Sequence, residues 1–379
     1  MATPTNAHPS RRTLRRVALA VGLAGLAGLA WAARDVPAAL GARLTGADAE
    51  RLRRSPQYRD GAFRNRQNAR MIEVEEDRKV LWEFIFGMQR RRPRLPVPLL
   101  RPGQPPPVTD RELNAVWYGH ASTLLEIEGR RVLLDPVWSR RCSPSHLVGP
   151  RRLHPVPVGI DDLPLLDAIL ISHDHYDHLD LATVRELTAT GRAPFLVPLG
   201  VGAHLRRWGV PDERIVELDW SQQHHVAGLT ITATAAQHFS GRGLRRDDTL
   251  WASWVVAGLH RRVFYTGDSG YFDGYAEIGA AHGPFDLTLM QIGAYSPAWS
   301  GIHMFPEQAV TAHRELRGGL LVPVHWATFN LSTHAWAEPV ERLCAAAREQ
   351  DVRVAVPMPG ERVVVDAPQR PEPWWRAVT

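Results

Sequence analysis

Cysteine is scarce in this chain of 379 residues, where Cys142 and Cys344 are the only two and lie far apart. A disulfide framework and a zinc site of the CxxC type are therefore not expected, and both residues are predicted to be small buried side chains. Lysine is scarcer still, because Lys79 is the only one and arginine supplies every other basic group. The sequence also has no internal repeat, and its length and 44% hydrophobic content predict one large domain with a smaller appendage.

The chain has little net charge once its N-terminus is set aside. The formal charge is +5, but residues 1–32 contribute four arginines and no acidic residue. The rest of the chain is therefore close to neutral, which is a poor basis for binding nucleic acid. We expect no nucleic-acid partner, and a nuclease is the weakest enzymatic alternative.

Residues 1–33 have the features of a targeting segment. Residues 10–16 form a positive start, and residues 17–33 are an uncharged run rich in Ala, Leu and Gly. The paired arginines are followed by Thr-Leu, as in a twin-arginine export signal. We predict a signal peptide or a membrane anchor, with a buried N-terminal helix as the alternative. Export would place the protein in the cell envelope, either periplasmic or anchored on the outer side of the inner membrane.

The remaining chain divides by composition. Residues 34–112 are a Pro- and Arg-rich extension, expected to wrap the main domain, with helical character at 47–54 and 71–88. From residue 113 to about 366, short apolar strands alternate with helical patterns, and residues 367–379 form a C-terminal tail. Strands interleaved with helices throughout favour an α/β (α+β) domain in which helices cover two sheets.

The most informative segment is a cluster of metal-ligand residue types after the apolar run 168–171. Within six residues it contains His173, His175, Asp177 and His178. Imidazole and carboxylate groups at this density are costly to bury unless a cation gathers them, and both are standard zinc ligands. The alternative is a polar surface loop.

Three more candidates follow predicted strands, namely His238, Asp268 and His325. A histidine at a strand end is more often a capped surface residue, so none of them is informative alone. Loops at one edge of a sheet meet in space, and with the six-residue cluster these residues supply enough ligands for two metals.

The pattern His-x-His-x-Asp-His, followed by His238, Asp268 and His325, resembles the metallo-β-lactamase superfamily of binuclear zinc hydrolases over residues 113–366. Further segments resemble the branch of N-acyl-phosphatidylethanolamine-hydrolysing phospholipase D and its bacterial relatives, among them residues 117–122, 135–139, 237–240, 267–271 and 292–295. The resemblance implies an αββα sandwich of two mixed sheets flanked by helices. It also implies two Zn²⁺ ions per chain, one held by His173, His175 and His238, the other by Asp177, His178 and His325, with Asp268 bridging.

The resemblance further implies that Asp177, Asp268 and His303 take part in catalysis. His303 would lie near the leaving group and donate a proton, although Met304 and Phe305 depart from the short polar residue that relatives have before the following Pro. The two zincs, two carboxylates and one hydroxide leave a charge of about +1, which suits an anionic substrate or a developing oxyanion.

Other residues are candidates to support a ligand or to contact substrate. Asp135 and Asp174 are candidates to hydrogen-bond ligand imidazoles, against an Asp-Pro turn as the alternative for Asp135. His120 is either at the edge of the site or a satisfied core histidine. Substrate candidates are Trp138, Trp251, Trp299 and Phe239 for an apolar cleft and Arg242 and Arg245 for a phosphate, with core packing and a solvated loop as the alternatives.

The expected function is a phosphodiesterase of phospholipase D type that hydrolyses an N-acyl-phosphatidylethanolamine-like lipid through hydroxide held by the metals. One alternative is a zinc hydrolase of a carboxylic ester, lactone or β-lactam. Another is a non-catalytic metal-binding envelope protein. The expected partner is a small-molecule or lipid substrate, with membrane association as a further expectation.

Overall fold

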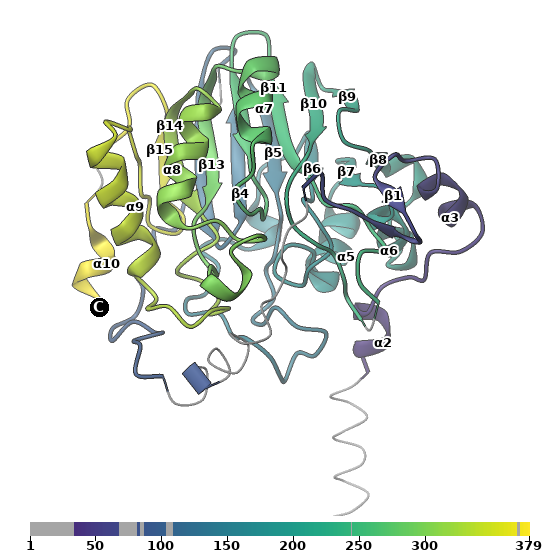
Figure 1. Cartoon of the computed structure of the whole chain (residues 1–379), viewed down its shortest axis with the longest axis horizontal. Helices are drawn as coiled ribbons and strands as arrows, with labels where there is room; N and C mark the ends of the chain where they lie inside the picture. Colours follow the sequence, from purple (N-terminus) through teal and green to yellow (C-terminus); the bar gives the residue numbers. More distant parts are fainter. Residues whose placement is uncertain (1–33, 68–81, 84–86, 104–108, 244, 370–371) are drawn as a thin grey trace, which may run out of the picture.

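The computed structural model describes residues 34–67, 82–83, 87–103, 109–243, 245–369 and 372–379. Two sheets stand between two groups of helices, so the αββα sandwich predicted from the sequence is confirmed (Figure 1). Helices α5 (Leu181–Thr190) and α6 (Val201–Arg207) lie on one side, and α8 (Pro306–Glu315) and α9 (Glu338–Glu349) on the other. The predicted targeting segment 1–33 lies outside the described residues.

The first sheet has seven strands in the order β15-β3-β4-β5-β6-β7-β8. Their bounds are β3 Leu113–Gly119, β4 Ser122–Ile127, β5 Arg130–Leu134, β6 Ala168–Leu170, β7 Phe195–Pro198, β8 Ile215–Leu218 and β15 Arg362–Val364. In this order, neighbouring strands from β15 through β3 and β4 to β5 pair antiparallel, whereas those from β5 through β6 and β7 to β8 pair parallel. The sheet is therefore mixed.

The second sheet has six strands in the order β14-β13-β12-β11-β10-β9. Their bounds are β9 Gln223–Val226, β10 Leu229–Thr234, β11 Ser253–Ala257, β12 Arg262–Tyr265, β13 Phe285–Gln291 and β14 Gly318–Val324. Here β12, β13 and β14 pair parallel and the others antiparallel. The parallel strands point their carboxyl ends to one edge.

Strands β3, β4, β6 and β7 of the first sheet are buried on both faces, which explains their largely apolar sequence. Successive side chains point to opposite faces. In β3, Ala115 and Trp117 face the core between the sheets, whereas Val116 and Tyr118 belong to a second core cluster with α5 and α6. Apolar contacts on both faces thus fix the register of these strands.

Helix α7 (Gly274–His282) was not predicted, because its sequence contains glycines that disfavour helices. Tertiary packing explains Gly279: a Cβ there would lie 2.1 Å from the carbonyl oxygen of Glu315. Helix α6 and the edge strand β9 were also missed. Residues 352–356 are apolar enough for a strand, but Val354 forms only an isolated bridge to Leu321.

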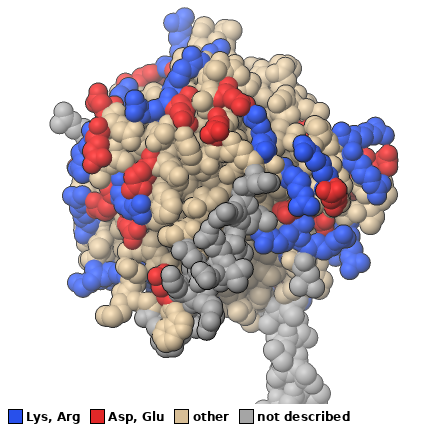
Figure 2. Space-filling model, in the orientation of Figure 1, with Lys and Arg blue, Asp and Glu red and all other residues tan. Residues whose placement is uncertain are grey.

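The described part of the N-terminal extension lies against the domain. It contains α2 (Val36–Ala39), α3 (Ala47–Leu52), β1 (Tyr58–Arg59) and β2 (Ala62–Phe63). Figure 2 shows basic and acidic side chains gathered together over α3 and α6, where Arg206 pairs with Asp48 at 2.7 Å. The helix predicted at 71–88 falls mainly outside the described residues.

The last residues pack into the domain rather than extend from it. Helix α10 (Trp374–Ala377) buries Trp374 and Trp375 against Trp326. In the part of the chain that the structure describes, no helix has both the length and the hydropathy needed to cross a bilayer.

Candidate metal centre

The loop after β6 carries the six-residue cluster and folds back on itself. The backbone N–H groups of His178 and Leu179 both donate to the carbonyl oxygen of His175, at 3.0 and 2.8 Å. The loop ends at Asp180, whose carboxylate accepts from Thr183 N–H and caps α5. A short, internally bonded loop therefore presents its imidazoles from a fixed backbone.

Three imidazoles form the first ligand group. His175 Nδ1 lies 2.8 Å from His173 Nε2 and 3.2 Å from His238 Nε2. Two ligands of a tetrahedral zinc, each about 2.1 Å from the metal, are about 3.4 Å apart. Small adjustments would seat a cation among these nitrogens, and the set is the one that the sequence resemblance implied for one zinc.

The second group gathers around Asp177. Its Oδ2 lies 3.2 Å from His325 Nε2, 3.5 Å from His178 Nε2 and 2.9 Å from His120 Nε2. The first two are the partners that the resemblance implied. The close approach of His120 adds a third nitrogen and a fourth residue to this group, so His120 stands at the site rather than in a remote part of the core.

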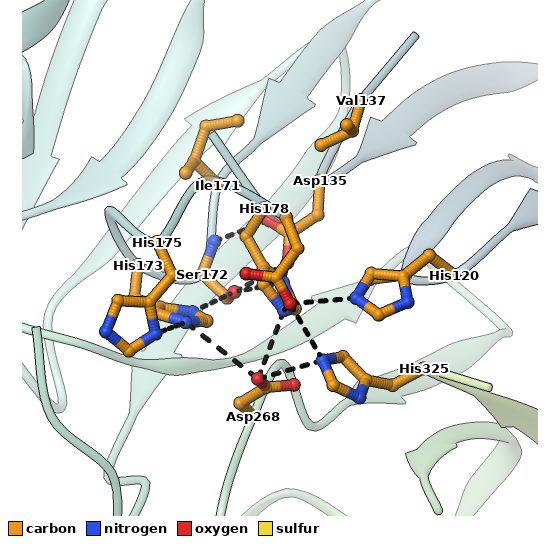
Figure 3. Close-up of polar contacts among 12 residues, drawn as sticks. His120, Asp135, Val137, Ile171, Ser172, His173, His175, His178, Asp268 and His325 are labelled. Carbon is orange, nitrogen blue, oxygen red and sulfur yellow. Dashed lines mark hydrogen bonds and ion pairs between the residues drawn. The ribbon is translucent and has the colours of Figure 1, made fainter. Parts of the chain in front are cut away.

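Asp268 lies between the two groups (Figure 3). Its Oδ2 is 3.0 Å from His325 Nε2 and 3.1 Å from His178 Nε2, and 3.9 Å from His238 Nε2. The structure therefore brings all seven predicted ligands together around one buried carboxylate. This oxygen faces nitrogens of both groups, which is the placement that the sequence resemblance implied for Asp268.

The electrostatics of the centre favour a cation. Burial alone would lower the pKa of His325, but the Asp268 and Asp177 carboxylates outweigh it and raise that pKa to about 9. For the Asp268 carboxyl, burial alone would raise the pKa, but His178 and His325 hold that pKa well below its usual range. In the metal-free protein His325 therefore holds a proton at pH 7, which a divalent cation would displace.

The buried polar atoms lead to the same conclusion. Nε2 of His178 and Oδ1 of Asp268 are buried and make no hydrogen bond with any described residue. Such atoms are costly unless something binds them. Imidazole nitrogens and carboxylate oxygens are the donor set of zinc, so the residues present fit that metal.

The backbone at the site is strained at three positions. His120, Asp135 and His325 have φ values of 54°, 37° and 63°, in a region that residues other than glycine seldom occupy. Gly267 also has a positive φ, and a Cβ there would lie 2.5 Å from Ser172. Strain persists where surrounding packing enforces it, which is common at functional sites.

Asp135 supports the ligand His178. Its Oδ2 accepts from His178 Nδ1 at 2.6 Å, from Ser172 Oγ at 2.5 Å and from the Tyr265 hydroxyl, while Oδ1 accepts from Ser172 N–H at 2.6 Å. Because Nδ1 is bonded to Asp135, Nε2 is the nitrogen of His178 that faces Asp268 and Asp177, and it offers a lone pair to a metal once its proton leaves. Asp135 therefore sets both the tautomer and the ring orientation.

Asp174, in contrast, does not reach a ligand imidazole. Its carboxylate lies 3.4 Å from Nε2 of His204 and accepts from Gly241 N–H at 2.7 Å. The prediction that it supports a ligand ring is therefore corrected. The alternation along the loop turns Asp174 away from the metal side and toward α6.

Two predicted substrate contacts are structural residues. Trp251 is buried and donates to Asn65 Oδ1 and the Ala236 carbonyl oxygen, each at 3.0 Å. Arg242 is buried under the ring of Tyr176 and donates to the carbonyl oxygens of Ala39, Asp174 and Leu179. Neither side chain is available to a substrate, so both expectations are corrected.

A cavity of about 500 Å³ opens over the ligands His175, Asp177 and Asp268. Its wall includes Phe239, Trp299, Leu331, His303 and Arg246. Phe239 and Trp299 were predicted to line a cleft, whereas Trp138 lines a separate, larger cavity of about 1180 Å³ that contains none of the seven ligands. We assign the chemistry to the smaller cavity because it contains the ligands.

His303 and Arg246 add polar groups to this wall. His303 Nε2 lies 4.0 Å from Asp268 Oδ2, and burial lowers the pKa of His303 to about 4. A neutral imidazole at pH 7 can hold a hydrogen bond but has no extra proton to donate. The Arg246 guanidinium lies 4.2 Å above the Phe239 ring, whereas Arg245 pairs with Asp248 and points to solvent.

Three residues near the centre, Arg246, Tyr265 and Asn65, were not predicted from the sequence. Asn65 Nδ2 donates to the carbonyl oxygen of His238 at 2.8 Å, although the two residues are 173 positions apart. No motif marks that contact. Arg246 had a signal, because it belongs to the same arginine-rich loop as Arg242 and Arg245, but its direction depends on packing.

Comparisons with known proteins agree with this geometry. The family described as "Beta-lactamase superfamily domain" matches residues 130–326. An archaeal metallo hydrolase from Ignicoccus hospitalis, Igni18, has the same fold with a TM-score of 0.52 and 22% identity, over 66% of this chain and 97% of that one. The chain therefore belongs to the metallo-β-lactamase superfamily of metal-dependent hydrolases.

Relatives in sequence identify the branch of the superfamily to which the chain belongs. N-acyl-phosphatidylethanolamine-hydrolyzing phospholipase D 1 of Caenorhabditis elegans is 37% identical over 244 residues, which cover 61% of this chain and 68% of that protein. Within the superfamily, the chain belongs to the branch that includes this enzyme. An uncharacterized protein of Mycobacterium tuberculosis is 54% identical over 378 residues, which cover 97% of this chain and 99% of its own length.

Proposed function

We propose that this protein is a binuclear zinc phosphodiesterase of phospholipase D type. The observation that carries the proposal is the pair of ligand groups on either side of Asp268, at the floor of a partly apolar cavity. Zinc held there would supply Lewis-acid charge and lower the pKa of water toward neutrality. The similarity to an N-acyl-phosphatidylethanolamine-hydrolyzing enzyme supports a lipid phosphodiester as the substrate.

The residues of the cavity suit an amphiphilic, anionic substrate. Phe239 and Trp299 offer apolar surface for an acyl or glyceryl group, and Arg246 offers a positive charge at the same wall. A cationic guanidinium beside an aromatic ring binds phosphate oxygens through charge-assisted hydrogen bonds. This arrangement favours a phosphodiester over a neutral carbonyl compound.

The histidines of the centre have distinct tasks in this proposal. His173, His175 and His238 would hold one zinc, and Asp177, His178 and His325 the other, with His120 hydrogen-bonded to Asp177 Oδ2 at 2.9 Å. His303, neutral at pH 7, would donate its N–H hydrogen bond to the leaving oxygen and pass a proton only when one reaches it from solvent.

Two alternatives remain distinct from this proposal. In the first, the same centre hydrolyses a carboxylic ester, lactone or β-lactam. In the second, the protein turns over no substrate and is a metal-binding protein of the cell envelope. Purified, zinc-loaded protein should be assayed with bis-p-nitrophenyl phosphate, an N-acyl-phosphatidylethanolamine and a chromogenic β-lactam. Turnover of both phosphodiesters supports the proposal, whereas turnover of the lactam alone refutes it.

We further propose that residues 1–33 export the protein to the cell envelope, where membrane lipids would be accessible. The arginine pairs 11–12 and 15–16 are followed by an uncharged, largely apolar run, and this order supports the proposal. The test is fractionation of cells that express the full chain or a variant with Arg11 and Arg12 replaced by Lys. Retention of both proteins in the cytosol would contradict the proposal.

A further inference from the structure

His238 needs support from outside the two sheets. It follows β10, which ends at Thr234, and lies in the long connection to β11, which begins at Ser253. Its backbone N–H and C=O therefore have no strand neighbour, yet His238 is buried. Buried backbone groups must find hydrogen-bond partners.

Asn65 of the N-terminal extension supplies both partners. Its Oδ1 accepts from His238 N–H at 3.0 Å, and its Nδ2 donates to the His238 carbonyl oxygen at 2.8 Å. Trp251 Nε1 also donates to Oδ1, at 3.0 Å. Two donors directed at one atom establish that this atom is the oxygen, so the amide has only one satisfactory orientation.

The ring of His238 is held by a third contact. Its Nδ1 lies 3.0 Å from the carbonyl oxygen of Ile302, which requires the proton on Nδ1 and leaves the lone pair on Nε2. That nitrogen faces His175 at 3.2 Å. With the backbone fixed by Asn65 and the ring fixed by Ile302, Nε2 is directed into the first ligand group before any metal binds.

The extension is anchored to the same connection at two more points. Phe63 N–H donates to the Asp247 carbonyl oxygen at 2.8 Å, and Arg242 Nε donates to the Ala39 carbonyl oxygen at 2.8 Å. Asn65 is thus one of several contacts between residues 39–65 and the connection that carries His238. This segment lies outside residues 130–326, which match the family domain.

We propose that Asn65 is a positioning residue of the metal centre, through which the N-terminal extension fixes the ligand His238. The inference rests on the metal-binding role of His238 in the proposed function, but not on the identity of the substrate. In these terms the extension is part of the metal site, and a domain cut at residue 113 would bind zinc poorly.

Substitution by Asp separates hydrogen bonding from simple packing. Asn65→Asp keeps the size and the acceptor for His238 N–H, but it places a carboxylate oxygen against the His238 carbonyl oxygen and removes the donor. A residue that only fills space would tolerate this change. Asn65→Ala removes both bonds. Gln67→Ala is the matched control, because Gln67 lies exposed in the same segment and its Nε2 donates to the Asp273 carboxylate at 3.1 Å, away from the proposed ligands.

The experiment measures zinc affinity of the full-length chain by competition with a chromophoric chelator. We expect the zinc held by His173, His175 and His238 to bind at least about 10-fold more weakly in Asn65→Asp and Asn65→Ala than in the wild type. Gln67→Ala should bind zinc as the wild type does. Amide hydrogen exchange of residues 235–240 in the zinc-free protein should be faster in both Asn65 variants by a similar factor.

The outcomes separate the two proposals. Wild-type zinc affinity and unchanged exchange in Asn65→Asp would overturn the positioning role while leaving the hydrolase proposal intact, and this variant decides the question if Asn65→Ala does not fold. Absence of zinc binding by the wild type would instead refute the proposed metal centre itself.

Discussion

Replacing Asp135 by Asn is expected to remove one zinc and leave the other. In the wild type, three donors converge on Asp135 Oδ2, from Ser172 Oγ, His178 Nδ1 and the Tyr265 hydroxyl. An amide can keep its oxygen toward Ser172 N–H, which places its NH₂ group against those three donors. His178 can then satisfy the amide only by moving its proton to Nε2, which abolishes the lone pair that the metal requires.

The size of the effect follows from these contacts. Hydrogen bonds to a charged group contribute about 1.5–3 kcal/mol and neutral ones about 0.5–1.5 kcal/mol. Weakening three bonds by about 1 kcal/mol each would lower the free energy of unfolding of the metal-free protein by about 3 kcal/mol. Loss of a supporting carboxylate typically lowers metal affinity about 10- to 100-fold.

The assay is zinc content after dialysis, together with chelator competition and urea unfolding of the metal-free protein. Asp167→Asn is the matched control, because Asp167 accepts from Arg131 N–H at 2.8 Å and lies outside the metal centre. Two zincs of unchanged affinity in a folded Asp135→Asn variant would refute the reasoning about the tautomer of His178.

Three further predictions concern the cavity and the core. Arg246→Ala should lower kcat/KM for an anionic phosphodiester about 10-fold or more, as expected for a lost charge-assisted hydrogen bond. Hydrolysis of a neutral ester should change little, and Arg245→Ala is the control. Equal losses on both substrates would contradict this prediction. His303→Gln should keep its zinc but turn over about 100-fold more slowly, and a loss of zinc would instead identify His303 as a ligand. Burial lowers the pKa of His313 to about 4 from 6.5, so the unfolded chain binds more protons and stability falls as pH drops from 6.5 toward 4, by about 2 kcal/mol at pH 5. His313→Asn should reduce this difference in urea unfolding between pH 7 and pH 5, and an unchanged difference would contradict it.

The sequence predicted the residues of the centre because their pattern is local. His173 to His178 are adjacent in the chain, and Asp268 and His325 follow strands whose apolar sequence marks them clearly. Parallel strands carry such ends to one edge of a sheet, so position along the chain was enough to predict proximity. The two-sheet architecture followed from the same alternation of strands and helices.

Contacts that depend on tertiary packing could not be predicted in this way. Arg242, Arg245 and Arg246 have similar sequence surroundings, yet one is buried, one points to solvent and one lines the cavity. Trp251 was a reasonable cleft residue in a chain with 13 Trp, but its neighbours enclose it. Asn65 hydrogen-bonds to His238, which lies 173 positions further along the chain. No sequence pattern predicts a contact between residues so far apart.

The central claim is that seven side chains hold two metal ions around Asp268. Elemental analysis of the purified, zinc-loaded full-length chain, read against an Asp268→Ala variant, tests it most directly. We predict two zinc ions per chain in the wild type and a clear loss in the variant. Fewer than one zinc per wild-type chain, or an Asp268→Ala variant that retains both ions, would contradict it.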